Sequence, residues 1–421
     1  RMCLKISKGG ALKNPFLSLK YSNFRIYWIG MNLSLIGSWM QSVALPWLVL
    51  SITADAFKVS LVAAARFLPA LLFTPFSGVL LDKFNRKKIL LLAQIGMAVT
   101  ASIFAVMSFC ELYSFGKILF CAFASGIFTS MDAPSRQSMV KDLIDSPRDL
   151  ANAIALNSMS FNVARIAGPA LAGIVMALWG VGFCFLFNAL SFLGIIVSLF
   201  FIRIPPSVTT LSSRSGGVFA SIGAGISYVS HKKTLSELMI IVLIVATLVP
   251  NYNVTISALV KLSLDADERS FGYLMSALGV GAFCGALFVA VFDKLGIRKI
   301  RSCAIAMGVS LALTGAANSF AWAAAGLAVT GFLFVIINSS INSTVQMHVS
   351  NEFRGRVLSL YALFLIGSTP FGALISGFFT ELLGARVALA ICGAISILLL
   401  LALFYGFKIR RRTHFIFRDK A

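Results

Sequence analysis

Acidic residues are scarce in this chain of 421 residues. Only 15 are Asp or Glu, three are His, and 12% are charged in total, whereas 58% are hydrophobic. A soluble globular domain carries about twice that charged fraction, so there is too little polar surface to cover the apolar side chains with water. This composition excludes a soluble enzyme and a disordered chain, and it indicates that apolar surface faces lipid.

Motifs that hold metals, nucleotides or disulfides are missing. The seven cysteines are scattered without a CxxC or Cys/His spacing, and most lie within apolar runs. No GxxxxGK phosphate loop is present, and the chain offers no nucleophile triad. We therefore expect no enzymatic activity, no metal, no cofactor and no use of ATP as the energy source.

Basic residues are abundant, and their positions indicate their role. The formal net charge is +21 and the isoelectric point is about 10.1, values that are typical of nucleic-acid binding. However, Lys and Arg gather in short clusters between long apolar runs. Cytoplasmic loops of membrane proteins retain positive charge in this way, so we expect contact with a lipid bilayer and no binding of nucleic acid.

Twelve segments are apolar over roughly the 20 residues that a helix needs to cross a bilayer. Their approximate limits are 24–50, 59–81, 89–109, 116–136, 151–177, 181–202, 237–260, 271–292, 300–318, 321–347, 357–380 and 384–408. With a cytoplasmic N-terminus, 29 Lys and Arg fall inside, five fall outside and two lie within spans. Because both terminal segments are equally basic, an even number of spans with both termini cytoplasmic is favoured over eleven or thirteen.

The spans predict an all-α membrane protein in two halves. We expect six-helix bundles over 1–202 and 237–408, a cytoplasmic linker with an interfacial helix over 203–236, and a basic cytoplasmic tail over 409–421. Glycines in the two halves share an offset of 204 residues, because Gly168, Gly173 and Gly180 match Gly372, Gly377 and Gly384. A repeat in parallel orientation predicts two equivalent bundles that rock about a central site, as in secondary transporters.

Segment 78–87 (GVLLDKFNRK) resembles the loop motif GxxxD(R/K)xGR(R/K) between spans two and three of the major facilitator superfamily, with Asn85 in place of the second Gly. Segment 289–299 keeps the charges of the motif, but Val289 replaces its first Gly. The resemblance covers nearly the whole chain. It implies the fold of that superfamily, with twelve helices in two pseudo-symmetric bundles.

Three further segments resemble one branch of the superfamily, the transmembrane secretion effectors, which include siderophore and drug exporters. They are 37–41 (GSWMQ), 132–137 (DAPSRQ) and 354–361 (RGRVLSLY). Segment 164–173 (ARIAGPALAG) is similar to the antiporter motif gxxxGPxxGG, which implies that Gly168, Pro169 and Gly173 pack helices closely. These resemblances favour export over uptake.

In the superfamily, the loop motif forms an inner gate with an acid on span four, which implies Asp132 as the partner of Arg86. Physical reasoning also allows Asp82 to face the positive end of the next helix and Arg86 and Lys87 to pair with acids at helix ends. The residues expected in the gate are Gly78, Asp82, Lys83, Arg86, Lys87, Asp132, Arg136, Asp293, Lys294 and Arg298. The alternative is that these are interfacial charges that only set the topology.

Two arginines lie within predicted spans, where inserting a charge costs about 2.5 to 3.5 kcal/mol. Arg66 lies about seven residues below the outer end of span two, and Arg165 lies near the middle of span five. They can receive an anionic group of a substrate, such as a carboxylate or a catecholate. Alternatively, they bond helix carbonyls and neighbouring amides and hold the bundle together.

Polar residues at helical spacing mark spans one, four, seven and ten, which line the cavity in this superfamily. Span seven carries Tyr252 just after Pro250, where we predict a kink. The residues expected to contact substrate are Gln41, Arg66, Arg165, Asn251, Asn253, Asn338 and Asn342. Asn and Ser side chains can instead bond helices to one another.

A proton gradient is the expected energy source. Asp132 is the best-placed carboxylate near the pathway, whereas Glu237, Glu381 and His348 lie near helix ends. The sequence and its resemblances predict an exporter of the bacterial inner membrane that moves a small amphipathic or anionic molecule, a siderophore or a drug, by alternating access. We expect no obligatory partner protein. The alternatives are an importer or lysophospholipid flippase on the same fold, and a non-transporting scaffold or receptor.

Overall fold

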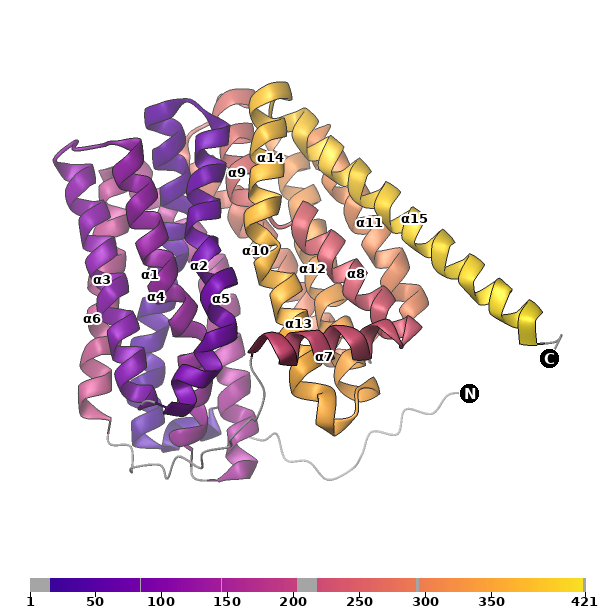
Figure 1. Cartoon of the computed structure of the whole chain (residues 1–421). Helices are drawn as coiled ribbons and strands as arrows, with labels where there is room; N and C mark the ends of the chain where they lie inside the picture. Colours follow the sequence, from indigo (N-terminus) through magenta and orange to yellow (C-terminus); the bar gives the residue numbers. More distant parts are fainter. Residues whose placement is uncertain (1–15, 84, 145, 203–217, 293–294, 419–421) are drawn as a thin grey trace, which may run out of the picture.

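The computed structural model describes residues 16–83, 85–144, 146–202, 218–292 and 295–418. Within helices, the described side chains are those outside 74–83, 147–148, 218–222, 351–352 and 408–418. All regular secondary structure in these residues is helical (Figure 1). The fold class is therefore all-α, as the sequence predicts.

Helices of the first half begin close to the predicted span limits. They are η1 (Leu17–Lys20), α1 (Ser22–Thr53), α2 (Ala56–Lys83), α3 (Arg86–Phe109), α4 (Phe115–Asp142), α5 (Pro147–Trp179) and α6 (Val181–Phe201). The start of α3 is fixed by Asn85, whose side-chain Oδ1 accepts hydrogen bonds from the backbone N–H groups of Lys87 and Lys88.

Helices of the second half include two interrupted spans. They are α7 (Val218–Ser230), α8 (Lys233–Leu248), α9 (Tyr252–Ala258), the π-helical turn η2 (Leu259–Ser263), α10 (Glu268–Val291), α11 (Ile297–Gly315), α12 (Phe320–His348), α13 (Asn351–Gly367), α14 (Thr369–Leu383) and α15 (Ala385–Arg418). The break between α8 and α9 contains Pro250, which confirms the predicted kink because proline cannot donate a helical hydrogen bond.

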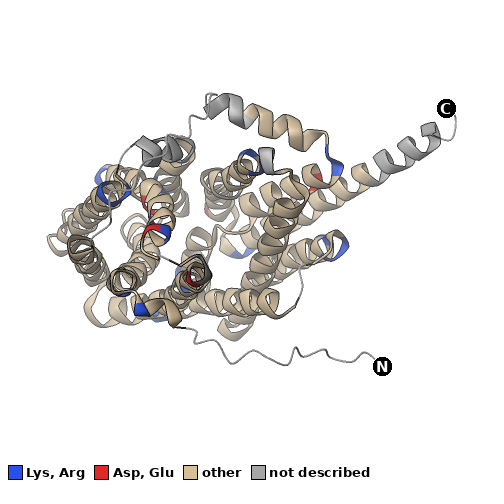
Figure 2. Cartoon of the chain, turned by 90° about the horizontal axis from the view of Figure 1, so that it is seen from below, with Lys and Arg blue, Asp and Glu red and all other residues tan. Residues whose placement is uncertain are grey.

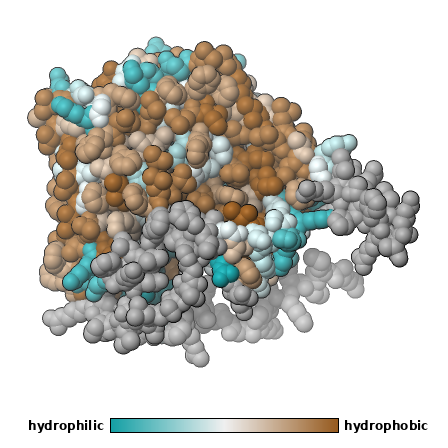
Figure 3. All heavy atoms as spheres, in the orientation of Figure 1, coloured by the Kyte–Doolittle hydropathy of each residue, from teal (hydrophilic) through white to brown (hydrophobic). Residues whose placement is uncertain are grey.

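Eleven helical stretches among the described residues are long and apolar enough to cross a bilayer, with α8–η2 and α13–α14 each counted as one. The predicted ninth span corresponds to α11, which begins with a basic turn that contains Arg298, Lys299 and Arg301 and is not among the eleven. Figure 3 shows that apolar side chains cover most of the visible lateral face. The chain is therefore a multi-pass membrane protein.

The first residue of α1 and the last turn of α15 both lie toward the lower end of the molecule in Figure 1, which we call the terminal end. The connection between α1 and α2 and that between α14 and α15 lie at the other end, which we call the opposite end (Figure 1). Gly180 and Gly384 join equivalent helices in the two halves, and both have positive φ, +89° and +81°, as glycine readily adopts.

The other repeated glycines make equivalent contacts between helices. A Cβ on Gly168 would overlap Trp39 of α1, and one on Gly372 would overlap the carbonyl oxygen of Thr247 in α8. These are the first spans of their respective halves. The internal repeat read from the sequence is thus also a repeat of contacts.

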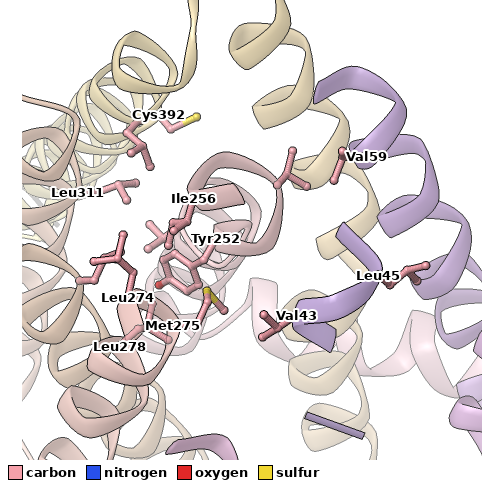
Figure 4. Packing of buried hydrophobic residues seen from close by; sticks show 14 of the residues in the cluster. Val43, Leu45, Val59, Tyr252, Ile256, Leu274, Met275, Leu278, Leu311 and Cys392 are labelled. Atoms are coloured by element: carbon pink, nitrogen blue, oxygen red, sulfur yellow. The ribbon is translucent and has the colours of Figure 1, made fainter. Parts of the chain in front are cut away.

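Two groups of helices pack side by side. Helices α1–α6 contact one another, as do α8–α15, and the groups meet where α5 packs on α10, α2 packs on α14 and α1 packs on α9. The largest buried apolar cluster runs across this boundary, from Val43 and Val59 to Ile256 and Leu274 (Figure 4). Helix α7 lies across the terminal end and packs on α13 (Figure 1).

Candidate functional site

Aromatic and charged side chains join the two groups at the opposite end. Trp47 Nε1 donates a hydrogen bond to Glu268 Oε1 at 3.2 Å, and the indole stacks on Phe271 with 5.6 Å between ring centroids. Lys261 Nζ donates to Ser51 Oγ at 2.8 Å and lies 5.3 Å from the centroid of the Trp47 ring. Helix α1 is therefore tied to α10 and η2 at this end.

Two further hydrogen bonds tie the groups together from the opposite end down to mid-height. The backbone N–H of Ala56, the first residue of α2, donates to Glu381 Oε2 of α14 at 2.7 Å. Nearer the middle, Ser276 Oγ donates to the carbonyl oxygen of Ile166 at 2.9 Å. The contacts between α5 and α10 thus extend down to about residue 166 of α5.

Exposure along one stripe of α5 changes at this depth. Ile154, Phe161, Arg165, Ala172 and Met176 lie seven or four residues apart, so they share one face of the helix. Ile154 and Phe161 are 50% and 45% exposed, Arg165 is half-buried, and Ala172 and Met176 are buried in the cluster that joins the two groups. The stripe is therefore accessible toward the terminal end and closed beyond Arg165.

Two side chains with unpaired buried polar atoms lie near the point where the stripe closes. Arg165 Nε is buried without a hydrogen-bond partner, and so is Oη of Tyr252, the first residue of α9, which is 7% exposed. The two side chains are close enough to interact electrostatically. Figure 4 shows Tyr252 directed toward α10, and the next residue, Asn253, has an unpaired buried Oδ1. Buried polar atoms in a native fold normally have partners, so this cluster is suited to a polar ligand.

Arg66 is the second arginine within the membrane-spanning part. Its carbonyl oxygen lies against Gly126 of α4, where a Cβ would overlap it. Its side chain is half-buried and makes no hydrogen bond or ion pair with the side chains and backbone that the structure describes. Like Arg165, it leaves a positive charge free for a ligand.

Gln41 and Asn251, which were also predicted to contact substrate, pack against neighbouring helices. Gln41 is buried on α1, where its Oε1 accepts a hydrogen bond from Asn188 Nδ2 of α6 at 2.5 Å. This places Gln41 within the first group of helices, as the alternative interpretation of helix bonding expects. Asn251 Nδ2 donates to the Thr247 carbonyl at 2.7 Å, and its amide is pressed against Gly372.

On α12, Asn338 Nδ2 donates to the Phe334 carbonyl at 2.9 Å, and the carbonyl oxygen of Asn338 accepts from Tyr361 Oη at 3.1 Å. Asn342 Oδ1 accepts from Gln346 Nε2 at 2.8 Å. Both asparagines are half-buried, so their positions remain compatible with a lining role. The side-chain amides of Asn338 and Asn342 have hydrogen-bond partners, whereas Arg165 Nε, Tyr252 Oη and Asn253 Oδ1 have none.

The gate at the terminal end differs from the prediction in one ion pair. Arg86 Nη1 pairs with Asp142 Oδ1 at 2.9 Å, so the implied pairing with Asp132 is wrong in this structure. The two acids lie at different depths along α4. Asp142 is the last residue of α4 and pairs with Arg86 at the start of α3, whereas Asp132 lies ten residues further in, about 15 Å along the helix. Lys87 Nζ donates to the carbonyl of Ile202 at 2.8 Å.

Asp132 instead belongs to a buried network. Arg136 Nε donates to Asp132 Oδ1 at 2.6 Å and Arg136 Nη2 donates to Ser34 Oγ of α1 at 2.9 Å. Gln94 Nε2 of α3 donates to the same Asp132 oxygen at 2.5 Å. Tyr27 is buried close enough to interact electrostatically with both charges, and its Oη has no partner. The network links three helices of the first group near the terminal end.

A comparable pair in the second group was not assigned from the sequence. Glu237 of α8, which is 1% exposed, accepts hydrogen bonds from Arg301 of α11, and the guanidinium of Arg301 lies 5.2 Å from the centroid of the Phe404 ring in α15. Sequence position alone placed Glu237 near a helix end. Gln94 and Tyr27 were missed because single polar residues in apolar runs give no pattern.

Several predicted gate residues lie outside the described parts. These are Asp293 and Lys294, the surroundings of Gly78, and the side chains of Asp82 and Lys83. Arg298 is exposed at the start of α11. Figure 2 shows Lys and Arg around the helix ends of the terminal face. Basic residues at helix ends are expected where they set the orientation of a membrane protein.

The packing residues lie where the sequence expects them. Gly168 contacts Trp39, and Gly173 lies against Gly272 of α10, where a Cβ would sit 3.1 Å from the Gly272 Cα. The backbone oxygen of Pro169 would overlap a Cβ on Gly272. This segment of α5 thus forms part of the contact between the two groups.

Comparison with known proteins agrees with this architecture. The chain is 24% identical over 400 residues to the MFS-type transporter YfiS of Bacillus subtilis, covering 91% of this chain and 93% of YfiS. It is 23% identical to macrolide efflux protein A of Streptococcus pyogenes, with 87% and 92% of the two chains covered. It is 27% identical over 162 residues to the staphyloferrin A transporter of Staphylococcus aureus, with 37% and 40% covered.

Among solved structures, the nucleoside transporter NupG matches with a TM-score of 0.71 at 15% identity, covering 94% of this chain and 99% of NupG. This match supports the fold alone. The family model for transmembrane secretion effectors matches residues 13–415. The chain is therefore a transporter rather than an enzyme, and it belongs to the transmembrane secretion effector family of the major facilitator superfamily.

Proposed function

We propose that this protein exports a small amphipathic or anionic molecule, a siderophore or a drug, from the cytoplasm by alternating access. The observation that carries this proposal is the stripe on α5, which is accessible toward the terminal end and closed beyond Arg165 by contacts between the two helix groups. A ligand that enters from the terminal end reaches Arg165 and Tyr252, whose polar atoms lack partners. Export then requires the contacts at the opposite end to break.

The direction is supported by relatives. A macrolide efflux protein aligns over most of the chain, and a staphyloferrin A transporter aligns over 37% of it. The first name indicates a drug and the second a siderophore. The word efflux in the first name means outward transport, which also fits the gxxxGPxxGG resemblance.

We place the protein in the bacterial inner membrane with both termini in the cytoplasm. The basic residues at the terminal face favour that orientation. In this arrangement α11 is a membrane span whose basic first turn lies at the cytoplasmic surface, held by the pair between Arg301 and Glu237. Twelve spans then form two bundles, 1–202 and 237–408, with α7 in the linker at the interface.

The proposed energy source is the proton gradient, which the protein would use by proton antiport. A pH difference supplies about 1.4 kcal/mol per unit, and the membrane potential adds about 2.3 kcal/mol per charge for each 100 mV. Asp132 is the proposed proton carrier, because protonation would weaken its pair with Arg136 and release a link between α1 and α4. That link lies near the end that must close during export.

The test compares cells that express the wild type with cells that express Arg165→Gln, in a host that lacks its major efflux pumps. Culture medium and cell extracts are examined by untargeted mass spectrometry. If the protein is an exporter, a compound should be enriched in the medium and depleted in the cells that express the wild type, compared with those that express Arg165→Gln. A compound that accumulates inside wild-type cells would instead identify an importer. Identical pools would overturn export and leave a non-transporting scaffold.

A further inference from the structure

The surroundings of Arg165 indicate what kind of molecule the site accepts, an inference that rests on the proposed function. Phe161 lies four residues before Arg165, so the two side chains are neighbours on one face of α5. The Phe161 ring meets Trp39 of α1 edge to face, with 5.6 Å between centroids and an angle of 73°. Trp39 also packs against Gly168, two turns further along α5. An aromatic pair thus stands directly beside an unpaired guanidinium.

The aromatic pair faces open space rather than core. Phe161 is 45% exposed, and Trp39 is half-buried. Edge-to-face packing leaves ring faces free, and aromatic rings stack well with other flat ring systems. The stripe shows that the exposure is on the terminal side of the closed contact between α5 and α10. The pair can therefore meet a ligand before it reaches Arg165.

The polar end of the site selects for negative charge. Arg165 Nε and Tyr252 Oη are both hydrogen-bond donors without partners, and their side chains are close enough to interact electrostatically. Neighbouring donors of this kind suit a carboxylate or sulfonate oxygen. Acidic residues of the described helices pair with arginines other than Arg165. Asp132, Asp142 and Glu237 each form an ion pair with such an arginine. A cationic ligand would meet like charge in a medium of low dielectric constant, where repulsion is strong.

We infer that the site binds aromatic anions, with a flat ring system against Trp39 and Phe161 and an acidic group on Arg165 and Tyr252. Adjacent residues on one helix face lie about 5–6 Å apart at Cβ. That separation matches an acid attached directly, or through a short link, to an aromatic ring. Fatty acids lack the ring, and aromatic amines have the wrong charge.

The test uses three small probes and the purified full-length protein in lipid nanodiscs. The probes are 2-naphthoate, 2-naphthylmethylammonium, which has the same ring with opposite charge, and cyclohexanecarboxylate, which has the acid without the aromatic ring. Binding is measured by calorimetry and needs neither a gradient nor a direction of transport. Failure of export and failure of this inference are therefore distinguishable.

The wild type is expected to bind 2-naphthoate about tenfold more tightly than either other probe, because charged hydrogen bonds and ring stacking each contribute. Arg165→Gln should lower the affinity for 2-naphthoate about tenfold and remove the preference for the anion. Arg165→Lys should keep the preference for negative charge. Phe161→Leu should weaken binding of 2-naphthoate and leave that of cyclohexanecarboxylate unchanged.

Matched controls separate the site from general effects. Arg269→Gln removes an exposed arginine at the start of α10, and Phe120→Leu removes a ring that is 71% exposed on α4; neither should change binding. Each variant is first shown to elute as the wild type does in size-exclusion chromatography. Equal affinity for the anionic and cationic naphthalene probes would overturn the inference, and so would unchanged binding of 2-naphthoate in Arg165→Gln.

Discussion

At the residue scale, two ion pairs on α4 differ in burial and therefore in energetic weight. The side chains of Asp132 and Asp142 are both 16% exposed, but their partners differ, because Arg136 is 10% exposed and Arg86 is 34% exposed. Removing one member of a buried pair leaves an uncompensated charge, which costs more than the pair itself contributes. A pair whose arginine reaches solvent contributes less, because water and salt screen that charge.

Asp132→Asn is expected to destabilise the protein by about 3 kcal/mol, because Arg136 remains buried without its partner. The matched variant Asp142→Asn should cost at most about 1 kcal/mol. Both are measured by unfolding of the purified protein in detergent. The double variant Asp132→Asn/Arg136→Gln should recover part of the loss. Equal, small effects of both single variants would show that the network contributes no more than a surface pair.

Sequence patterns single out a residue where the residue itself is anomalous. Arg165 and Arg66 stood out because charges within spans are costly, and both are unpaired in the described structure. The partner of Arg86 was mispredicted, since a motif gives the kind of pair but the depth along α4 depends on how α3 and α4 are placed. Gln41 was assigned to the pathway from helical spacing, which does not tell whether a face meets a cavity or another helix.

At the scale of elements, small residues decide how closely the two groups approach. Gly377 of α14 lies against Ser60 of α2 at the opposite end, as Gly173 of α5 lies against α10. A Cβ on Gly377 would overlap the Ser60 side chain, so a larger residue forces the helices apart. These contacts belong to the closed opposite end.

Gly377→Val should therefore shift the protein toward a form that is open at the opposite end. We expect a cysteine at Ala56, which is 1% exposed, to react several-fold faster with a membrane-impermeant maleimide in this background, because its neighbour Glu381 moves away with α14. Gly96→Val is the control, since Gly96 contacts Phe128 within the first group. A cysteine at Ala56 that stays equally unreactive in both variants would contradict this role.

Helix α7 is fastened to α13 by polar and aromatic contacts. Tyr228 stacks on Phe353 with 4.5 Å between centroids, and its Oη accepts hydrogen bonds from Lys232 Nζ at 2.6 Å and the Ser350 N–H at 3.1 Å. The hydrogen bond from Lys232, followed by those from Ser350, lowers the pKa of Tyr228 to about 8. The linker helix is thus coupled to the second group.

Docking of α7 should strengthen as pH rises from about 8 toward 10, because the phenolate accepts these hydrogen bonds better than the phenol does. The pKa of the docked Tyr228 is about 8 against an ordinary 10.0, so the gain is complete above pH 10 and absent below about pH 8. A spectrophotometric titration of wild type minus Tyr228→Phe should show one tyrosinate forming near pH 8. A difference titration centred on pH 10 would contradict the coupling.

Helix positions were predictable because apolar length is a local property, and each predicted span matches a described helix or an interrupted pair. The break at Pro250 and the turns at Gly180 and Gly384 were also readable, since proline and glycine act locally. Which helices join the two groups was not predicted, because it depends on how the groups pack on one another. The docking of α7 on α13 was not, because it depends on a contact between residues more than 100 positions apart.

At the scale of the whole molecule, the two ends differ. Contacts among Trp47, Glu268, Lys261 and Ser51 close the opposite end, while α5 is accessible from the terminal end as far as Phe161. In alternating access the two ends exchange these roles around a site at mid-height. The repeated glycine contacts make this exchange possible, since equivalent interfaces occur in both halves.

Double electron–electron resonance between spin labels tests alternating access most directly. One pair is placed at Ile52 and Leu262, which are exposed at the opposite end, and another at Gln137 and Gln346, which are exposed toward the terminal end. The seven native cysteines are replaced first. Distances are recorded in nanodiscs at pH 5.5 and 7.5, with and without 2-naphthoate.

We expect a short distance at the opposite end and a long one at the terminal end in the population that matches this structure. Changing pH or adding the probe should lengthen the first and shorten the second together. If both pairs keep one distance under every condition, or lengthen together, the two helix groups do not alternate and the protein does not transport by this mechanism.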